Sequence, residues 1–197
     1  MVSSAPQSED PAGTSPGFPR ARRRAPRKAT AKHLENVALG YLARFQATVR
    51  SLERVLHRRV LASARHHGTD TAEGRAWVAD LIARYRRAGL LDDAAFARAR
   101  ASRLHRRGIS ARSIAARLKA KGVAGAEIDA ALGGLGDGTG AQCPPDLAAA
   151  RRTARRRRLG PWRGEDQRAA RREKDLAALA RAGFSYSVAK TVIDGER

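Results

Sequence analysis

The chain has 197 residues and carries Lys+Arg 40 against Asp+Glu 19, which gives a formal net charge of +21. A single cysteine, Cys143, excludes an intrachain disulfide and with it a disulfide-stapled secreted domain. No stretch approaches the ~18 apolar residues of a membrane span, and residues 1–30 contain no apolar signal-peptide region. We therefore expect a soluble, cytoplasmic protein with no membrane partner, and the positive charge favours a polyanion such as nucleic acid.

Residues 1–30 are rich in Pro, Ser, Gly and Arg and show no hydrophobic period. They offer too little apolar surface to offset the entropy lost on ordering, so we expect a disordered tail. The tail ends in a basic cluster, which favours either a solubilising role or a flexible arm that contacts phosphate. The cluster consists of Arg20, Arg22, Arg23, Arg24, Arg27 and Lys28.

Helical periodicity begins at residue 31, and no convincing strand pattern occurs anywhere in the chain. Residues 31–91 contain three apolar stripes at three- and four-residue steps, which predict three helices. Asp70 is placed to cap the third helix and Gly89 to end it. The stripes are formed by Leu34, Val37, Ala38, Tyr41, Leu42 and Phe45, by Val49, Leu52, Val55, Leu56 and Val60, and by Trp77, Val78, Leu81, Ile82 and Tyr85.

Two further units follow the same plan. Residues 92–134 predict a helix that begins at Asp92 or Asp93, a second helix capped by Ser110, and a short third helix. Residues 135–145 form a linker rich in Gly and Pro, and residues 146–194 predict three more helices.

The internal repeat is the main architectural signal. Residues 50–56 match 112–118 at an offset of 62, and residues 118–132 match 179–193 at an offset of 61, in helix ends and in apolar positions. A unit of three short helices is too small to bury a good core by itself. Stacked units therefore predict an all-α, elongated and curved array in which neighbours contact only neighbours.

The segment Gly89-Leu90-Leu91-Asp92-Asp93-Ala94-Ala95-Phe96-Ala97 lies where the first and second units meet. We expect Leu90 and Leu91 to fill the interface and Phe96 to lie in the core. Acidic residues stabilise the positive N-terminal end of a helix, so capping accounts for both aspartates. A pair of carboxylates can also indicate a catalytic site, but no acid, base or phosphate loop accompanies this pair.

This segment resembles the signature of the RecX family of bacterial recombination regulators. The likeness is supported by Arg107-Gly108-Ile109-Ser110, by Lys119-Ala120-Lys121-Gly122-Val123 and by Gly183-Phe184-Ser185-Tyr186. It covers residues 31–194 and is strongest over 77–133. The resemblance implies a non-enzymatic helical repeat protein that binds the RecA recombinase and its filament on single-stranded DNA. Such proteins hold back the ATPase, strand-exchange and coprotease activities of the filament, and so modulate recombinational DNA repair and the SOS response.

Three runs of cations are the candidate contacts with recombinase or DNA. Few carboxylates interrupt them, which favours phosphate or acidic-protein contact over a merely solvated helix surface. Phosphate contacts give affinity and register with little sequence readout, and duplex DNA stays open as a second ligand. The candidates are Arg98, Arg100, Arg103, Arg106 and Arg107 in the first run, Arg112, Arg117, Lys119 and Lys121 in the second, and Arg151, Arg152, Arg155, Arg156, Arg157 and Arg158 in the third.

Other features have weaker functional interpretations. Trp162 is placed to stack on a base, but such a tryptophan is more often a core residue or a helix-end plug. The Gly-rich run 133–140 lacks the strand that precedes a phosphate-binding loop, so we interpret it as a linker. Adjacent His66 and His67 point in different directions, and Cys143 lacks a base partner. We expect no metal, no cofactor and no catalysis.

A general nucleic-acid-binding helical protein, such as a helix-turn-helix transcription regulator, is the alternative. It predicts comparable binding to duplex and single strands with no recombinase present, and a sequence-specific site. The sequence shows no defined recognition helix and no dimer element, which disfavours this alternative, and we expect a monomer.

Overall fold

The computed structural model describes residues 25–135 and 145–196. The predicted tail and the predicted linker fall for the most part in residues 1–24 and 136–144, which lie outside these ranges. The described residues form helices and no strand, which confirms the all-α class.

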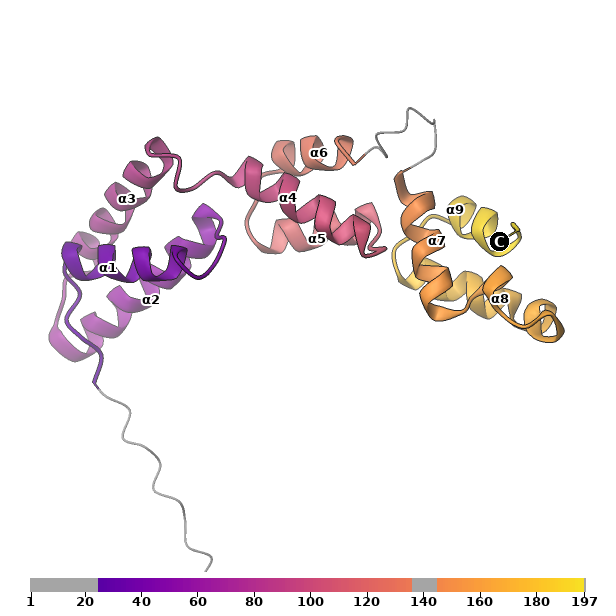
Figure 1. Ribbon diagram of the computed structural model, residues 1–197. Coiled ribbons are helices and arrows are strands. Elements are labelled where there is room, and N and C mark those ends of the chain that lie inside the picture. The colour runs from indigo at the N-terminus through magenta and orange to yellow at the C-terminus, as the bar shows by residue number, and fades with distance from the viewer. Residues whose placement is uncertain (1–24, 136–144, 197) are drawn as a thin grey trace, which may run out of the picture.

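The helices pack in three consecutive groups, which we call units 1, 2 and 3. Among the described residues, every extensive helix–helix contact lies within one unit. The units follow one another along an arc, so the molecule is elongated and curved, as predicted (Figure 1). Unit 1 contains α1 (Ala31–Leu42), α2 (Val49–His67) and α3 (Thr71–Arg87); unit 2 contains α4 (Asp93–Arg106), α5 (Ala111–Ala120) and α6 (Gly125–Gly133); unit 3 contains α7 (Pro145–Arg157), the 3₁₀ turn η1 (Gly160–Trp162), α8 (Glu165–Arg181) and α9 (Tyr186–Ile193).

Each unit has a hydrophobic core of its own. In unit 1, Leu52 and Leu56 of α2 are fully buried, and the matching repeat positions Ile114 and Leu118 of α5 are fully buried in unit 2. Leu179 of α8 has the same role in unit 3. The sequence repeat is therefore a repeat of core positions, and the molecule holds three small cores rather than one large core.

The predicted helix starts and stops agree with the structure where the signal is local. Asp92 caps α4 because its Oδ1 accepts the N–H of Ala95 (2.8 Å), and the side chain of Asp70 caps α3. Gly89 follows α3 with φ +70°. In this left-handed conformation, the Leu90 N–H donates to the Tyr85 carbonyl (2.9 Å) and closes the helix end.

Units 1 and 2 meet through polar groups at helix ends. The Thr48 hydroxyl, at the N-terminus of α2, donates to the Lys121 carbonyl at the C-terminus of α5 (2.6 Å). The Val49 N–H, the next group of α2, donates to Asp93 Oδ1 of α4 (2.9 Å). The start of α2 is thus held by two helices of the following unit.

Units 2 and 3 repeat this joint with equivalent groups. The Ser110 hydroxyl, at the N-terminus of α5, donates to the Ala182 carbonyl at the C-terminus of α8 (2.8 Å). The Ala111 N–H donates to Asp146 Oδ1 of α7 (2.8 Å). In both joints, the following unit contributes an aspartate from its first helix and a carbonyl from the end of its middle helix. The two joints therefore share these equivalent contacts.

Glycine is required where the middle helices touch across the joints. Gly122 (φ +84°) and Gly183 (φ +94°) follow α5 and α8 in the left-handed region. A Cβ on Gly183 would lie 2.6 Å from Ser110 Oγ, and a Cβ on Gly122 would collide with the side chain of Arg50. The two glycines therefore permit both the backbone turn and the close approach of the units.

Two predictions about the first unit need correction. The first apolar stripe does not extend to Phe45, because α1 ends at Leu42 and the Phe45 side chain is 54% exposed in the loop that follows. Residues 25–30, which composition predicts to be part of the tail, contact unit 1. Ala29 is buried, its N–H donates to Ser63 Oγ (2.7 Å), and Thr30 caps α1.

The segment 89–97 also differs from expectation at two positions. Leu91 enters the core of unit 1, but Leu90 is 54% exposed and fills no interface. Asp93 does not cap its own helix, because its Oδ1 accepts the N–H of Val49 from α2. Both differences arise because the chain turns between units here, which a helical pattern does not encode.

Candidate functional site

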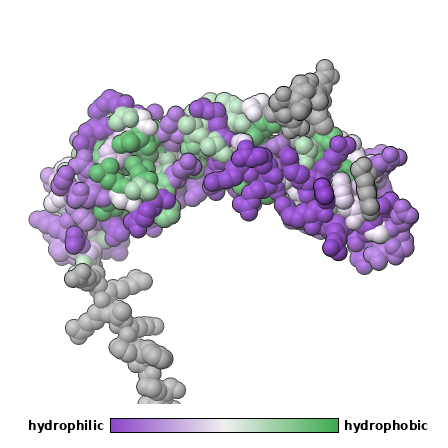
Figure 2. Space-filling view, viewed as in Figure 1, coloured by the Kyte–Doolittle hydropathy of each residue, from purple (hydrophilic) through white to green (hydrophobic). Residues whose placement is uncertain are grey.

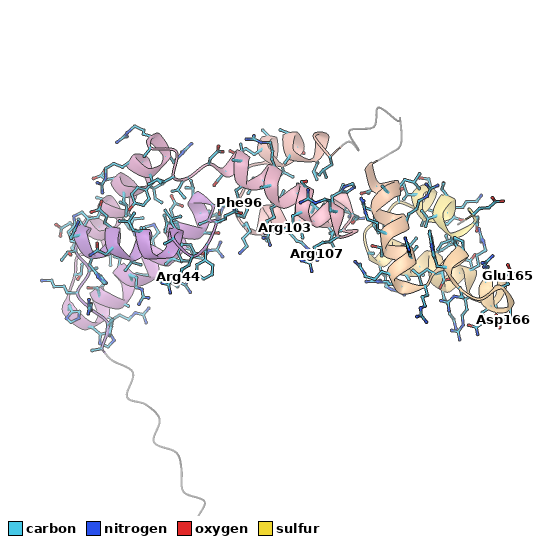
Figure 3. All side chains as sticks on the ribbon, in the orientation of Figure 1. Arg44, Phe96, Arg103, Arg107, Glu165 and Asp166 are labelled. Atoms are coloured by element: carbon cyan, nitrogen blue, oxygen red, sulfur yellow. The ribbon has the colours of Figure 1, made fainter. Side chains whose placement is uncertain are left out.

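Most arginines on α4 and directly after it are exposed to solvent. Ala97, Ala101 and Leu104 are buried, whereas Arg98, Arg103, Arg106 and Arg107 are exposed and Arg100 is half-buried. Arg103 and Arg107 are one helical turn apart and lie along the concave edge of the arc (Figure 3). The Arg106 guanidinium donates to Ser102 Oγ (2.8 Å). None of these arginines has an ion-pair partner among the described residues.

The cations of α5 are equally free of carboxylate partners within the described ranges. Arg112, Arg117, Lys119 and Lys121 are all exposed and form no ion pair there. Unit 2 as described contains no ion pair at all, so its cations remain available to a polyanion. The visible lower surface of this unit is hydrophilic in Figure 2.

The third predicted run separates into free and structural arginines. Arg151, Arg152, Arg155, Arg157 and Arg158 are exposed and have no ion-pair partner in the part of the chain that the structure describes. The Arg156 side chain makes a structural contact instead, because it donates a hydrogen bond to the Arg107 carbonyl of unit 2 (2.7 Å). This contact adds to the joint between units 2 and 3.

Two arginines that follow in unit 3, Arg163 and Arg172, make contacts that stabilise the fold. Arg163 donates twice to Asp175, which is buried and also accepts the Gly160 N–H (2.9 Å), so this pair fixes the turn η1. Arg172 forms a bidentate salt bridge with Asp194, in which its Nε and Nη2 donate to the two carboxylate oxygens at 2.7 Å each. This contact lowers the pKa of Asp194 below its ordinary value. Cations on α8 are thus partly neutralised, whereas those on α7 are not.

Sequence reasoning missed a basic stripe on α2. Arg50, Arg54 and Arg58 recur at four-residue steps, so they share one helix face. All three are exposed, and none has an ion-pair partner among the described residues. The four-residue spacing of these arginines is visible in the sequence and could have predicted the stripe. Free cations therefore occur on all three units and along the whole array.

The segment 89–93 contributes to the walls of two hollows near the joint of units 1 and 2. One hollow, of about 440 Å³, is lined on its polar side by Asp92, Asp93, Glu127 and Arg86. Burial is the main cause that raises the pKa of Asp93 above its ordinary value, and the hydrogen bond from Val49 opposes this rise. The other hollow, a groove of about 420 Å³ beside Leu90 and Phe96, has mostly apolar residues in its wall together with Gln46 and Asp92.

His67 and Trp162 both make contacts within the fold. His67 Nε2 lies 2.6 Å from the Pro26 carbonyl, and no group of three or more His, Cys, Asp or Glu residues in 25–135 and 145–196 is placed to hold a metal ion. Trp162 is half-buried against the core of unit 3, which agrees with its interpretation as a core residue. Cys143 and most of the Gly-rich run lie outside the described residues. No described helix has the length and apolar character needed to cross a bilayer.

Comparison with known proteins assigns the chain to a family. Residues 92–132, which make up almost all of unit 2, match the family model described as the second three-helix domain of RecX. The chain is also 47% identical over 170 residues to the Regulatory protein RecX of Myxococcus xanthus (strain DK1622), and the match covers 86% of this chain and 88% of that protein.

The chain belongs to the RecX family. The resemblance inferred from residues 89–97 is therefore confirmed, and unit 2 of this RecX-family chain is the part that the family model recognises. The Myxococcus relative is named as a regulatory protein rather than as an enzyme. No solved structure matches the chain significantly.

Proposed function

We propose that this RecX-family chain is a non-enzymatic regulator that binds the RecA recombinase and its filament on single-stranded DNA. Binding restrains the ATPase, strand-exchange and coprotease activities of the filament, and so modulates recombinational repair and the SOS response. The observation that carries this proposal is the 47% identity to a Regulatory protein RecX along most of both chains.

The charge distribution supports a filament as the target. Free cations lie on α2, α4, α5 and α7, one stretch after another along an elongated body. A long polyanionic assembly contacts such an array at several points, and each neutralised phosphate releases counterions and adds affinity. We propose that the protein acts as a cytoplasmic monomer, binds single-stranded DNA through phosphate, and accepts duplex DNA as a second ligand.

The first prediction concerns the activity itself. The purified full-length protein lowers the ATP hydrolysis that single-stranded DNA stimulates in the cognate RecA, at substoichiometric or equimolar ratios. Hydrolysis is measured at modest salt, with folding verified by circular dichroism. Unchanged hydrolysis contradicts the proposal, and equal binding to duplex and single strands with no effect on RecA favours a general nucleic-acid-binding protein instead.

The second prediction concerns the exposed arginines of α4. Combined reversal by Arg103→Glu, Arg106→Glu and Arg107→Glu weakens inhibition and makes it less sensitive to salt. If all three contact single-stranded DNA, the slope of log affinity against log salt falls by about 2, since each phosphate contact contributes about 0.7. Titration across a salt series measures this slope.

A control for the α4 variant changes the same charge on unit 1. Arg65→Glu, Arg75→Glu and Arg87→Glu alter exposed arginines without ion pairs among the described residues. We expect a smaller loss from this control, because it retains the concave-edge arginines. Equal losses from both variants indicate a response to net charge alone and contradict a specific role for the α4 face.

A further inference from the structure

A groove with mostly apolar residues in its wall, together with Gln46 and Asp92, lies at the joint of units 1 and 2, beside the segment 89–97. Its walls come from the loop after α1, from the turn between the units and from the first turns of α4. Two of its wall residues, Phe45 and Leu90, are each 54% exposed, although both are large and hydrophobic. Clustered exposed apolar side chains mark interaction sites more often than isolated ones do. The principal apolar wall residues are Leu42, Phe45, Leu90, Ala95, Phe96 and Ala99.

The rim of this groove is cationic. Ala95 and Ala99 of the wall are followed at the next four-residue step by Arg103, so one stripe of α4 changes from apolar to basic. The Arg100 guanidinium lies 5.9 Å from the centre of the Phe96 ring. On the other side Arg44 adjoins Phe45 in the loop, where its Nε donates to the Gly40 carbonyl (2.9 Å). Figure 3 shows Phe96 between Arg44 and Arg103.

Negative charge is scarce in the groove itself. Asp92 is the single carboxylate among the wall residues, and its Oδ1 is engaged by the Ala95 N–H. Arg44, Arg100 and Arg103 have no ion-pair partner among the described residues. A ligand that complements this surface has apolar groups at its centre and carboxylates or phosphates at its edge.

The aromatic geometry favours a peptide over a nucleobase. The Arg100 guanidinium lies over Phe96, and the Phe45 ring packs against Tyr41 with centroids 5.2 Å apart. A base needs an open flat ring on which to stack, whereas most of the remaining wall is aliphatic. Aliphatic walls suit Leu-, Ile- or Val-type side chains, and the arginine rim then pairs with carboxylates of the same segment.

We propose that this groove binds an acidic segment of the recombinase, with one or two apolar side chains inserted beside Leu90 and Phe96. Carboxylates of that segment pair with Arg44, Arg100 and Arg103. The inference rests on the proposed function for the identity of the partner. It assigns the signature segment a docking role in addition to its role as a joint.

Site-specific crosslinking tests which molecule occupies the groove. The photoreactive residue p-benzoyl-phenylalanine replaces Leu90 in the full-length chain, and Leu61 in a control. Leu61 is 42% exposed on α2 and is not part of the groove wall. Each protein is irradiated with recombinase assembled on a fluorescent single-stranded oligonucleotide. We expect position 90, and not position 61, to give a product with the recombinase whose crosslinked peptide contains Asp or Glu close to the attachment point.

Other crosslinks identify other occupants. Attachment to the fluorescent oligonucleotide indicates a nucleobase site, attachment to residues 1–24 indicates the tail of this chain, and attachment to a second copy indicates self-association. Each of these results, and equally the absence of any crosslink at position 90, overturns the proposal.

Affinity measurements separate this inference from the proposed function. Leu90→Ser and Phe45→Ser change exposed side chains and leave the cores intact, and Leu61→Ser is the matched control. We expect the groove variants to bind DNA-free recombinase at least tenfold more weakly, with unchanged affinity for a single-stranded oligonucleotide. If the wild type inhibits the ATPase while the groove variants bind the recombinase at full strength, the groove proposal is wrong and the function stands. If the wild type does not bind the recombinase, both fail.

Discussion

Asp93 belongs to the family signature at residues 89–97 and also makes a hydrogen bond to a residue far away in the sequence. It stands beside a true helix cap, Asp92, but it accepts the N–H of Val49, which is 44 positions earlier in the chain. Its carboxyl is half-buried at the joint, and this burial raises its pKa from the ordinary value of 3.8. An acid whose pKa is raised in the folded state contributes stability below its unfolded pKa, and this contribution is lost as pH rises through the folded value.

The third prediction follows from this sign. Asp93→Asn keeps an oxygen that accepts the Val49 N–H but never ionises, so its free energy of unfolding relative to wild type increases as pH rises from below 3.8. Asp93→Ala loses the acceptor and costs about 0.5–2 kcal/mol at low pH, and this cost falls as pH rises, because the wild type then loses the contribution of its protonated carboxyl. Urea unfolding across a pH series measures both variants. Asp129→Asn, an exposed carboxylate on α6, is the control, and an Asn variant that becomes relatively less stable with rising pH contradicts the sign.

At the scale of single helices, the ends carry more information than the middles. The middle helices α2 and α5 begin with Thr48 and Ser110, which cap their own helix and also donate to a carbonyl of the next unit. The accepting carbonyls belong to Lys121 and Ala182, which follow α5 and α8 directly. The next residue in each case is a left-handed glycine, Gly122 or Gly183. The cap that begins one helix and the glycine that follows the end of another therefore lie on opposite sides of the same contact between units.

The fourth prediction compares glycines with and without a neighbour. Gly183→Ala destabilises by about 1–3 kcal/mol, because the left-handed φ of +94° is strained for alanine and the new Cβ lies 2.6 Å from Ser110 Oγ. Gly89→Ala costs less, since Gly89 has a φ of +70° but nothing within 4 Å of an added Cβ.

A third glycine is the control for that comparison. Gly125, at the start of α6, has no positive φ and no neighbour within 4 Å of an added Cβ, so Gly125→Ala is neutral or slightly stabilising. Chemical unfolding ranks the three variants. If Gly183→Ala proves no more costly than Gly89→Ala, the close approach of the units at Ser110 does not contribute to stability.

At the scale of the whole molecule, three separate cores are connected by a few hydrogen bonds. Extensive packing occurs within units, whereas the joints between described residues rely on helix caps and carboxylates. Such an array is long for its mass, and its radius of gyration exceeds the roughly 16 Å of a compact domain of equal length. Its curvature depends on the joints rather than on the cores.

The fifth prediction therefore separates shape from helix content. Thr48→Ala combined with Asp93→Ala removes the side-chain contacts of the first joint, which increases the maximum dimension in small-angle X-ray scattering while circular dichroism stays nearly constant. Thr30→Ala combined with Asp70→Ala is the matched control, because these side chains cap α1 and α3 within unit 1. An unchanged scattering profile for the joint variant means that other contacts set the arc.

Much of the candidate site could be predicted from the sequence, because the helical periodicity that places its cations is a local signal. Periodicity placed the cations of α4, α5 and α7 on helices, and the structure finds most of them exposed. The stripe on α2 had the same four-residue spacing. The structural roles of Arg156, Arg163 and Arg172 were not predictable, since each depends on a partner far away in the chain, at 49, 12 and 22 positions respectively.

The sequence by itself determined the helical class, the three-unit plan, the caps and the buried positions, because each depends on residues within a turn or two of one another. It also carried the family signature at the first joint. The tertiary structure alone decided that Asp93 and Asp146 serve the preceding unit, and that Phe45 and Leu90 stay exposed beside a cationic rim. These features depend on how helix ends from different units meet, and the periodicity of a single helix does not encode that geometry.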